Sequence, residues 1–467
     1  MSRFKVFLSV LLSVLTVSSL VACSSGSSSG GGQAPASSAS SGSSTTAAGS
    51  GEPTKILFWD MQGGSDNYFS IAAKHAASIT EDIPNITIEY QGIPWANRYE
   101  TFTTAIAAGE GPDMSTGGGY QSFQFYAMNE ILDISSVVDE WKADGTLDNY
   151  NMDLINYFQV GDAQVGIPFN VDPRFVLYRK DWFDAAGLEA PKTWDDIYAA
   201  AKQFTDPANG VYGVAYPCEG ADGNVLFMLW LGMNGSGVWT EDGTNVDWVN
   251  PKNVEVVDFI RKLNSEGLVP QGMSAYTNTE VIQLATQDKV AMVLGMGGNF
   301  ENQVAANGGD EKWAMIAPPA GPSANGNNSY VAAINAVMAY SQTEHPEETK
   351  AALKWWCENQ ITLFKDPDAA VGGLPARNDW LADQEYISQR GPFTTQFIDS
   401  GLMDTVHTLV YPATNINGWL TQNSFDAERW WSGLSQAILT TDIPADALLQ
   451  QRQDSAEKLM KDFGEAQ

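Results

Sequence analysis

The sequence has few cysteines, few histidines and few basic residues, and each scarcity excludes a class of function. Three cysteines, three histidines and 25 lysines and arginines stand among 467 residues, against 56 acids, so the formal net charge is −31 at pH 7. A chain this acidic cannot neutralise nucleic-acid phosphates and would therefore release no counterions on binding. Nucleic acid is excluded as a partner for this reason. His75, His345 and His407 show no metal-binding spacing such as H-E-x-x-H, so no metal site is expected.

The motifs of nucleotide and acyl-transfer chemistry are also missing. The glycines at 117–119 are not followed by Gly-Lys-Ser/Thr, so they do not form a phosphate-binding loop of that type. Neither a dinucleotide fingerprint nor a Gly-x-Ser-x-Gly elbow occurs in a suitable context, and no cofactor is expected. What is present is 43% hydrophobic and 11% aromatic residues, enough for a large core. The length exceeds what one core usually supports, which predicts two lobes or domains.

Residues 1–22 have the composition of a removable signal. Arg3 and Lys5 precede an apolar stretch, Val6–Leu20, and Cys23 follows small residues. This pattern resembles a bacterial lipoprotein signal, in which the cysteine is lipidated and becomes the first residue of the mature chain. A transmembrane anchor is the alternative, but the stretch is short and lacks a polar stop-transfer flank. We therefore expect a membrane anchor through lipid on Cys23.

Residues 23–53 are predicted to form a flexible tether. Serine, glycine, alanine and threonine make up most of this segment, a composition that cannot bury a core and that gives a reach of roughly 30 Å. Cleavage before Cys23 leaves 467 − 22 = 445 residues and removes two cations, so the mature charge is −31 − 2 = −33. Cys218 and Cys357 could form a disulfide or remain buried free thiols, and the sequence leaves both open.

Beyond the tether, short apolar segments alternate with helical ones. Strands are predicted at 55–59, 86–90, 112–114, 166–169, 175–178 and 290–294, and helices at 66–79 and 95–108, from Thr193 and from Pro346. This order predicts an α/β fold with mostly parallel sheets covered by helices on both faces. Ligands in such sheets lie beyond the carboxyl ends of the strands, here near 59–64 and 117–121.

The order and spacing of several short segments resemble one known family. The segments are YETFTTAIAAG (99–109), GPD (111–113), GIPF (166–169), LYRKDWFDAAG (177–187), PKTWDDI (191–197), VAM (290–292), APPAGP (317–322) and GGLP (372–375). Each is weak alone, but together they resemble the extracellular solute-binding proteins of ABC importers, in the large family (family 1) that mostly takes up carbohydrates.

The resemblance implies a two-lobed periplasmic-binding-protein-like fold of type II, with the ligand between the lobes and closure by a hinge motion. It places the crossovers near 168–170, near 314–318 and after about 367. The implied lobes are 54–168 plus 317–370 (N-terminal) and 169–316 plus 371–467 (C-terminal). The resemblance also implies a monomer that serves ABC permease subunits at the extracellular face of the cell membrane. The lipid tether suggests a single-membrane bacterium.

A sugar site needs aromatic rings for the C–H faces and polar groups for the hydroxyls. The residues expected to bind the ligand follow strand ends or the first crossover, or lie where the family presents contacts: Trp59, Gln62, Trp95, Arg98, Gly118, Tyr120, Gln121, Asp172, Arg174, Glu219, Trp230, Asn234, Gly298, Asn299, Asn417 and Trp419. Trp59 and Trp230 fit core positions as well, and Asp172 and Arg174 fit an internal ion pair. Many relatives carry a stacking tryptophan near Gly298 and Asn299, so another ring, such as Trp230 or Trp419, is expected to compensate.

Two other functions compete with binding of a carbohydrate, for which the aromatic residues favour an oligosaccharide. The same fold could bind an amino acid, a peptide, a polyamine or a metal chelate. A secreted glycosidase is the other alternative, although 56 acids make some carboxylate pair inevitable and therefore uninformative. Residues 242–247 (DGTNVD) resemble a calcium loop but lack its closing glutamate, so a hairpin turn is expected there.

Overall fold

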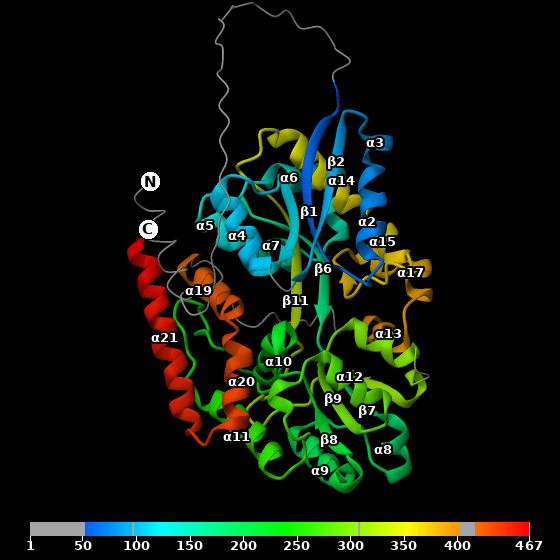
Figure 1. Ribbon diagram of the computed structural model, residues 1–467, viewed down its shortest axis with the longest axis vertical. Coiled ribbons are helices and arrows are strands. Elements are labelled where there is room, and N and C mark those ends of the chain that lie inside the picture. Colours follow the sequence, from blue (N-terminus) through cyan, green and yellow to red (C-terminus); the bar gives the residue numbers. More distant parts are fainter. Residues whose placement is uncertain (1–51, 96–97, 307–308, 401–415, 467) are drawn as a thin grey trace, which may run out of the picture.

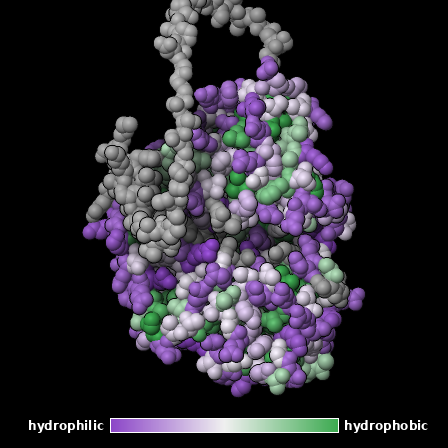
Figure 2. All heavy atoms as spheres, viewed as in Figure 1, coloured by the Kyte–Doolittle hydropathy of each residue, from purple (hydrophilic) through white to green (hydrophobic). Residues whose placement is uncertain are grey.

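A computed structural model describes residues 52–95, 98–306, 309–400 and 416–466, and confirms the predicted two-lobed α/β architecture (Figure 1). The N-terminal lobe contains a six-stranded sheet of order β12-β6-β11-β3-β1-β2, and the C-terminal lobe a four-stranded sheet of order β10-β7-β9-β8. In Figure 1 the strands β6 and β11 extend from the upper lobe toward the lower one. On the face seen in Figure 2, hydrophilic residues predominate, as expected for a chain with a net charge of −31.

The N-terminal lobe comprises β1 (Thr54–Met61), α2 (Tyr68–Ala77), α3 (Ile79–Asp82), β2 (Ile86–Ile93), α4 (Arg98–Ala108), β3 (Met114–Gly118), α5 (Gly119–Ala127), α6 (Ser135–Asp144), α7 (Met152–Tyr157), the hairpin β4 (Gln159–Val160) and β5 (Ala163–Gln164), β6 (Ile167–Pro173), β11 (Ala332–Ala339), α14 (Pro346–Asn359), α15 (Ile361–Lys365), β12 (Leu374–Pro375), α16 (Asn378–Leu381) and α17 (Gln384–Ser388).

The C-terminal lobe comprises β7 (Phe175–Arg179), α8 (Lys180–Ala186), α9 (Trp194–Phe204), β8 (Tyr212–Ala215), α10 (Gly220–Met233), α11 (Pro251–Ser265), α12 (Asn278–Thr286), β9 (Val290–Met296), α13 (Gly298–Ala306), β10 (Trp313–Ile316) and α18 (Pro392–Asp399), followed by α19 (Ile416–Ala427), α20 (Trp430–Thr440) and α21 (Ala445–Ala466). As predicted, Thr193 forms a capping box with Asp196 at the start of α9, and Pro346 is the first residue of α14.

The sheets are mixed, which corrects the prediction of mostly parallel sheets. Strand β1 pairs in parallel with β2 and β3, but β11 runs antiparallel to both β3 and β6, and β12 runs antiparallel to β6. In the C-terminal lobe β8 and β9 are parallel, whereas β7 is antiparallel to β9 and β10. The reason is that the chain enters each lobe more than once, and a strand returning from the other lobe meets the sheet from the opposite direction.

Helices cover both faces of the N-terminal sheet, so both faces of β1 are buried. Phe58 packs on Trp356 of α14 with ring centroids 4.6 Å apart. Its neighbour Trp59 points to the opposite face, where its ring lies 5.2 Å from that of Phe102 on α4. This alternation is the period-2 geometry of a strand between two helical layers. Trp59 is therefore a core residue.

The crossovers between the lobes differ from those expected. Strand β6 stays in the N-terminal sheet up to Pro173, which pairs with Ala332, so the first crossover is at Arg174. The segment before β11 belongs to the C-terminal lobe, because Ala320 accepts a hydrogen bond from the Trp194 amide (3.0 Å) and the Gly321 amide donates to Met233 (2.8 Å). The second crossover therefore lies near Val331.

The third crossover is also later in the chain than expected. Strand β12 pairs with β6 of the N-terminal sheet, and α16 and α17 pack beside it. The next helix, α18, packs on β10 and α13 of the C-terminal lobe. The chain thus crosses at 389–391, between α17 and α18. Sequence alone could not place these boundaries because they depend on hydrogen bonds with distant segments.

Both Cys218 and Cys357 are free and buried, and they lie in the cores of different lobes. Burial raises the pKa of each thiol, so the reactive thiolate is disfavoured. We expect an Ellman assay of the native Cys23→Ser chain to titrate neither thiol, and the same assay after unfolding without reductant to titrate both. A denatured protein without titratable thiols would instead indicate a disulfide.

Candidate functional site

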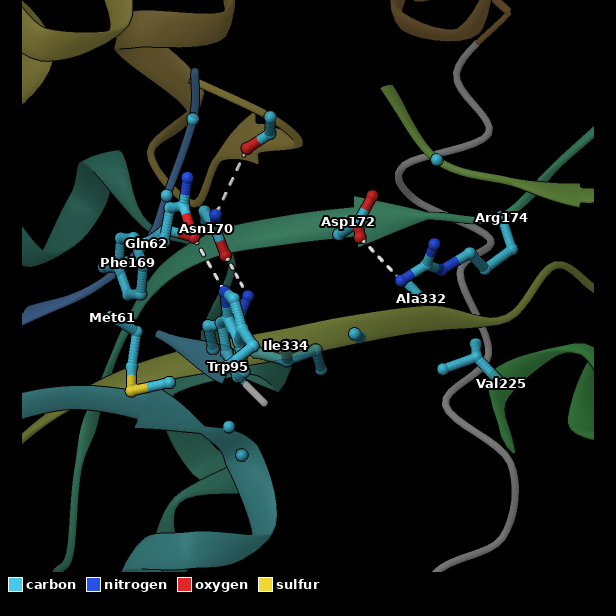
Figure 3. Close-up of a pocket in the computed structure, with 18 of the residues that line it drawn as sticks. Met61, Gln62, Trp95, Phe169, Asn170, Asp172, Arg174, Val225, Ala332 and Ile334 are labelled. Atoms are coloured by element: carbon cyan, nitrogen blue, oxygen red, sulfur yellow. Dashed lines mark hydrogen bonds and ion pairs between the residues drawn. The ribbon is translucent and has the colours of Figure 1, made fainter. Parts of the chain in front are cut away.

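A cavity of about 680 Å³ lies between the two lobes and is the candidate site (Figure 3). Strand ends of the N-terminal lobe form one wall, the crossover strands β6 and β11 form the floor, and α10, α12 and α13 of the C-terminal lobe contribute the other wall. The lining residues are Met61, Gln62, Gly63, Gly64, Ser65, Asp66, Trp95, Arg98, Tyr99, Gly118, Gly119, Tyr120, Tyr157, Phe169, Asn170, Asp172, Arg174, Val225, Met228, Asn278, Gly297, Asn302, Gln303, Val331, Ala332, Ala333, Ile334, Asn335, Ala370 and Gly372.

The turn after β1 is held by backbone contacts with the segment before β12. The Ser65 amide donates to the carbonyl of Ala369 (2.9 Å), and the Gly372 amide donates to the carbonyl of Gly63 (2.9 Å). A Cβ atom at Gly64 would lie 2.1 Å from the Ala369 carbonyl oxygen, so only glycine fits there. The cleft edge at Gln62 is therefore fixed by contacts between two segments that are some 300 residues apart in sequence.

Trp95 and Arg98 form an aromatic and cationic edge of the cleft. The indole Nε1 of Trp95 donates to the carbonyl of Gln62 (2.7 Å), which fixes the ring plane. The Arg98 guanidinium carbon lies 5.2 Å from the Trp95 ring centroid and 4.2 Å from that of Tyr99, both within cation–π range. A Cβ atom at Gly118 would lie 3.9 Å from the Trp95 ring, so the strand backbone comes close to this platform.

The floor of the cleft carries ordered polar groups on the two crossover strands. The Asn335 amide donates to the Asn170 side-chain oxygen (2.6 Å), and the Asn170 amide donates to the carbonyl of Gly372 (3.2 Å). Beyond Asn170, Asp172 and Arg174 form an ion pair of 2.8 Å, visible along the same strand in Figure 3. These groups present several donors and acceptors in fixed directions.

The ion pair on the floor also explains a glycine on the opposite wall. A Cβ atom at Gly297 would lie 2.9 Å from Asp172 Oδ1 and 3.0 Å from Arg174 Nη1. Any side chain there would displace the pair. Gly297 therefore leaves room for the two charged groups at the cleft.

The described part of the C-terminal wall is aliphatic and amide-rich. Val225 and Met228 of α10 face the cleft, and α12 and α13 contribute Asn278, Asn302 and Gln303. The Asn278 side-chain oxygen is buried without a hydrogen-bond partner among the described residues. A buried acceptor of this kind favours a ligand that donates a hydrogen bond.

A buried carboxylate lies beneath the N-terminal edge of the cleft. Asp60 Oδ2 accepts hydrogen bonds from the hydroxyls of Tyr68 and Tyr90 (both 2.9 Å), and Oδ1 accepts one from Thr116 (2.6 Å). The Thr116 oxygen in turn accepts from the Met61 amide (2.7 Å), at the start of the cleft edge. Burial outweighs these three bonds and raises the pKa of Asp60 from its ordinary 3.8 to about 6.

An interlobe cleft with aromatic rings and ordered polar groups suits a solute-binding protein, and comparison with known proteins decides the family. Residues 66–360, more than half of the chain, match the family model described as bacterial extracellular solute-binding protein. The chain belongs to this family. The resemblance inferred from the short sequence segments is thereby confirmed.

Individual relatives of this solute-binding protein are distant. Binding proteins of Brucella abortus and Brucella suis are 23% identical over 271 residues, which cover 58% of the chain and 64% of theirs, so the chain spans less than two thirds of these relatives. A mannitol-binding protein of Pseudomonas aeruginosa is 22% identical over 396 residues, covering 82% of the chain and 88% of that protein. The structure of a sugar transporter from Arthrobacter chlorophenolicus A6 with bound laminaribiose matches with a TM-score of 0.74 at 25% identity, covering 87% and 99%.

Seven of the residues predicted for the site line the cleft of this solute-binding protein: Gln62, Trp95, Arg98, Gly118, Tyr120, Asp172 and Arg174. Gly298 and Asn299 open α13 directly after Gly297, and their side chains lie outside what the structure describes. All seven lining residues lie at or shortly after a strand end, or on a crossover strand. Strand-end topology was therefore the informative signal.

The aromatic residues predicted in error are core residues. Trp59 is 7% exposed because β1 continues to Met61, and the cleft begins only there. Trp230 is fully buried in α10, with edge contacts to Trp194 and Tyr216. Trp419 is 2% exposed and stacks on Phe123 behind the cleft.

The remaining predicted polar residues do not line the cleft, and two of them, Glu219 and Asn234, make internal contacts instead. Gln121 is buried on α5, behind the cleft surface. Glu219 forms an ion pair of 3.2 Å with Arg429, and Asn234 donates to the Lys252 carbonyl (2.9 Å). Asn417 lies on α19, outside the cleft lining.

Sequence reasoning also missed cleft residues. Tyr99 and Phe169 lie within the family-like segments 99–109 and 166–169, and their aromatic rings were a usable signal. Tyr157 and Asn278 lie on helices that no pattern linked to a strand end, so only the fold brings them to the cleft.

Within the described ranges, no helix is both long enough and apolar enough to cross a membrane. The apolar stretch expected to be a signal, together with Cys23 and the tether up to residue 51, falls outside those ranges. The lipid anchor therefore stays a prediction.

Proposed function

We propose that this solute-binding protein captures a carbohydrate, favouring an oligosaccharide, between its lobes and delivers it to the permease of an ABC importer. The observation that carries the proposal is the pairing of aromatic platforms with fixed polar groups in one cleft. Trp95, Tyr99 and Tyr120 line it together with Asn170 and Asp172. Rings suit the C–H faces of a sugar, and the amides and charged groups suit its hydroxyls.

The known relatives support the same class of ligand. One solved structure of similar fold contains laminaribiose, and one relative is named for binding mannitol. The cavity of about 680 Å³ falls within the size range usual for small-molecule sites. A sugar bound there would contact both lobes and so favour the closed state.

We also propose that the protein works as a monomer held at the extracellular face of a single-membrane bacterium by lipid on Cys23. The support is the sequence pattern alone: a basic start, an apolar stretch and small residues before Cys23, followed by a serine- and glycine-rich tether. Labelling of cells with an alkyne fatty acid should mark the wild-type protein and leave the Cys23→Ser protein unmarked.

The ligand class can be tested by thermal unfolding of the Cys23→Ser chain with laminaribiose, maltose, maltotriose, mannitol, putrescine and a tripeptide. A ligand at about 100 times its Kd adds roughly 2.7 kcal/mol to the stability of the folded state. For a chain of this size we expect one or more of the sugars to raise Tm by several degrees. A shift with putrescine or the tripeptide alone would contradict the carbohydrate proposal, and release of free sugar from an oligosaccharide would indicate a glycosidase.

A further inference from the structure

We propose that Trp419 is a positioning residue for the cleft, which holds the rings of Tyr120 and Tyr157 from behind and links this wall to the C-terminal lobe through α19. The proposal rests on the proposed function of the cleft as a carbohydrate site. Trp419 is 2% exposed and does not line the cleft, so it acts through its neighbours rather than on the ligand.

The contacts of Trp419 place it under the tyrosine wall. Its ring stacks on that of Phe123, with centroids 4.0 Å apart and planes 3° from parallel. Tyr157 meets it edge-on at 5.4 Å, and Tyr120 lies at 6.0 Å. Both tyrosines are half-buried and line the cleft. One indole thus contacts two rings that line the ligand space.

Helix α19, which carries Trp419, contributes to the hydrophobic cores of both lobes. Trp419 lies in the cluster around Phe123 in the N-terminal lobe, whereas Phe425, six residues later, lies in the core of the C-terminal lobe with Trp248 at 5.3 Å. Figure 1 shows α19 at the level between the lobes, with α20 continuing into the lower one. The helix therefore bridges the lobes without being a chain crossover.

Buried hydrogen bonds connect the middle of α19 to both lobes. The Asn423 side-chain amide donates to Gln124 of α5 (3.0 Å) in the N-terminal lobe. The adjacent Gln422 accepts from the indole of Trp239 (2.8 Å) in the C-terminal lobe. Trp419, Gln422 and Asn423 are three and four residues apart and so lie on neighbouring parts of one helix surface.

The bridge leads on to the opposite wall of the cleft. Helix α20 follows α19 through Arg429, which adopts a left-handed conformation (φ 55°), and packs against α10. Helix α10 carries Val225 and Met228, which line the C-terminal wall. The two cleft walls are thus joined behind the ligand space by α19 and α20, so the support under the tyrosines depends on the arrangement of the lobes.

This geometry predicts an effect on affinity. A ring that is held in place before binding loses little freedom when the ligand arrives, whereas an unsupported ring must be ordered at that moment. We expect Trp419→Leu, which leaves space behind Tyr120 and Tyr157, to weaken the binding of a sugar by about 10-fold. The conservative Trp419→Phe keeps a ring and should weaken it by about 3-fold.

The experiment is isothermal titration calorimetry with laminaribiose, or with the panel sugar that gives the largest Tm shift. The control is Trp356→Leu, because Trp356 is as buried as Trp419 but packs on Phe58, on the sheet face opposite to α4, and does not line the cleft. We expect the control to lower Tm and to change Kd by less than about 2-fold. In a Tyr120→Leu, Tyr157→Leu background, Trp419→Leu should cause no further loss of affinity. Equal effects of the Trp419 and Trp356 variants on Kd, or an additive loss in that background, would overturn the proposal.

A ligand-free measurement separates this proposal from the proposed function. In protein labelled with 3-fluorotyrosine, the Tyr120→Phe and Tyr157→Phe variants assign the fluorine signals of the two cleft tyrosines. We expect Trp419→Phe to broaden or split both signals, as rings with more than one orientation would, and Trp356→Leu to leave them sharp. If no panel sugar binds the wild type but this result holds, the carbohydrate assignment fails and the positioning role stands. Signals that stay sharp with Trp419→Phe contradict the positioning role.

Discussion

Replacing Trp95 with alanine should weaken the binding of a carbohydrate by roughly 30- to 100-fold, because it removes the best-fixed aromatic platform at the cleft edge. The indole is held by its hydrogen bond to the Gln62 carbonyl and by the Arg98 guanidinium, so little freedom is lost when a sugar stacks on it. Trp95→Phe keeps a ring but loses the hydrogen bond, and we expect a loss of about 5-fold. Isothermal titration calorimetry with the sugar that stabilises the wild type measures both.

The chain offers a matched control for this prediction. Trp182 on α8 is also half-buried, and the Arg179 guanidinium lies 4.4 Å from its ring centroid, but Trp182 does not line the cleft. Trp182→Ala should leave Kd unchanged while it lowers Tm by about as much as Trp95→Ala does. An equal loss of affinity in the Trp95→Ala and Trp182→Ala proteins would mean that Trp95 acts through stability and not as a platform.

The sequence predicted the cleft best where one strand end decides what faces the ligand. Gln62 follows β1 and Gly118 is the last residue of β3, two strands whose direction is clear from short apolar runs, and both residues line the cleft. Trp59 precedes Gln62 by only three residues and was misplaced, because the apolar run does not show that β1 continues to Met61. An error of two residues in a strand end thus moves a side chain from the cleft to the core.

The presence of a tryptophan in the sequence does not show whether its ring stacks on the ligand or packs in the core. Trp230 lies on a side of the apolar helix α10 that is fully buried, and Trp419 lies behind the wall that it was expected to form. Both positions depend on which helices meet, which is a property of tertiary packing. The lobe boundaries failed for the same reason, since β12 is recognised only by its pairing with β6.

The second large expected effect is the pH dependence of folding stability that Asp60 contributes. The direction of this pH dependence follows from proton linkage. Burial raises the pKa of this carboxyl from 3.8 to about 6 in the folded protein, whereas the unfolded chain keeps the ordinary value. Between these two values the folded state therefore binds more protons than the unfolded state. The contribution of Asp60 to stability is fully present below about pH 4 and is lost as the pH rises to about 6, by about 3 kcal/mol in all.

Asp60→Asn removes this titration, so its stability relative to the wild type should rise by about 3 kcal/mol between about pH 4 and about pH 7. The difference between the two proteins isolates Asp60, because the other acidic groups titrate in both. Urea unfolding across this pH range measures the change in the stability difference between the two proteins. Replacing the carboxylate oxygen also shifts stability by an amount that does not depend on pH, and this shift does not affect the measured change. Tyr68→Phe serves as a second variant: it removes one hydroxyl that stabilises the carboxylate, so the pKa of Asp60 should rise further and the loss of stability should extend to higher pH.

Asp60 accepts a hydrogen bond from Thr116, which in turn accepts one from the Met61 amide at the cleft edge, so Asp60→Asn can also show whether that edge needs the negative charge. An unchanged Kd for the sugar would mean that hydrogen bonds alone hold the edge. Parallel stability curves for wild type and Asp60→Asn would contradict the raised pKa.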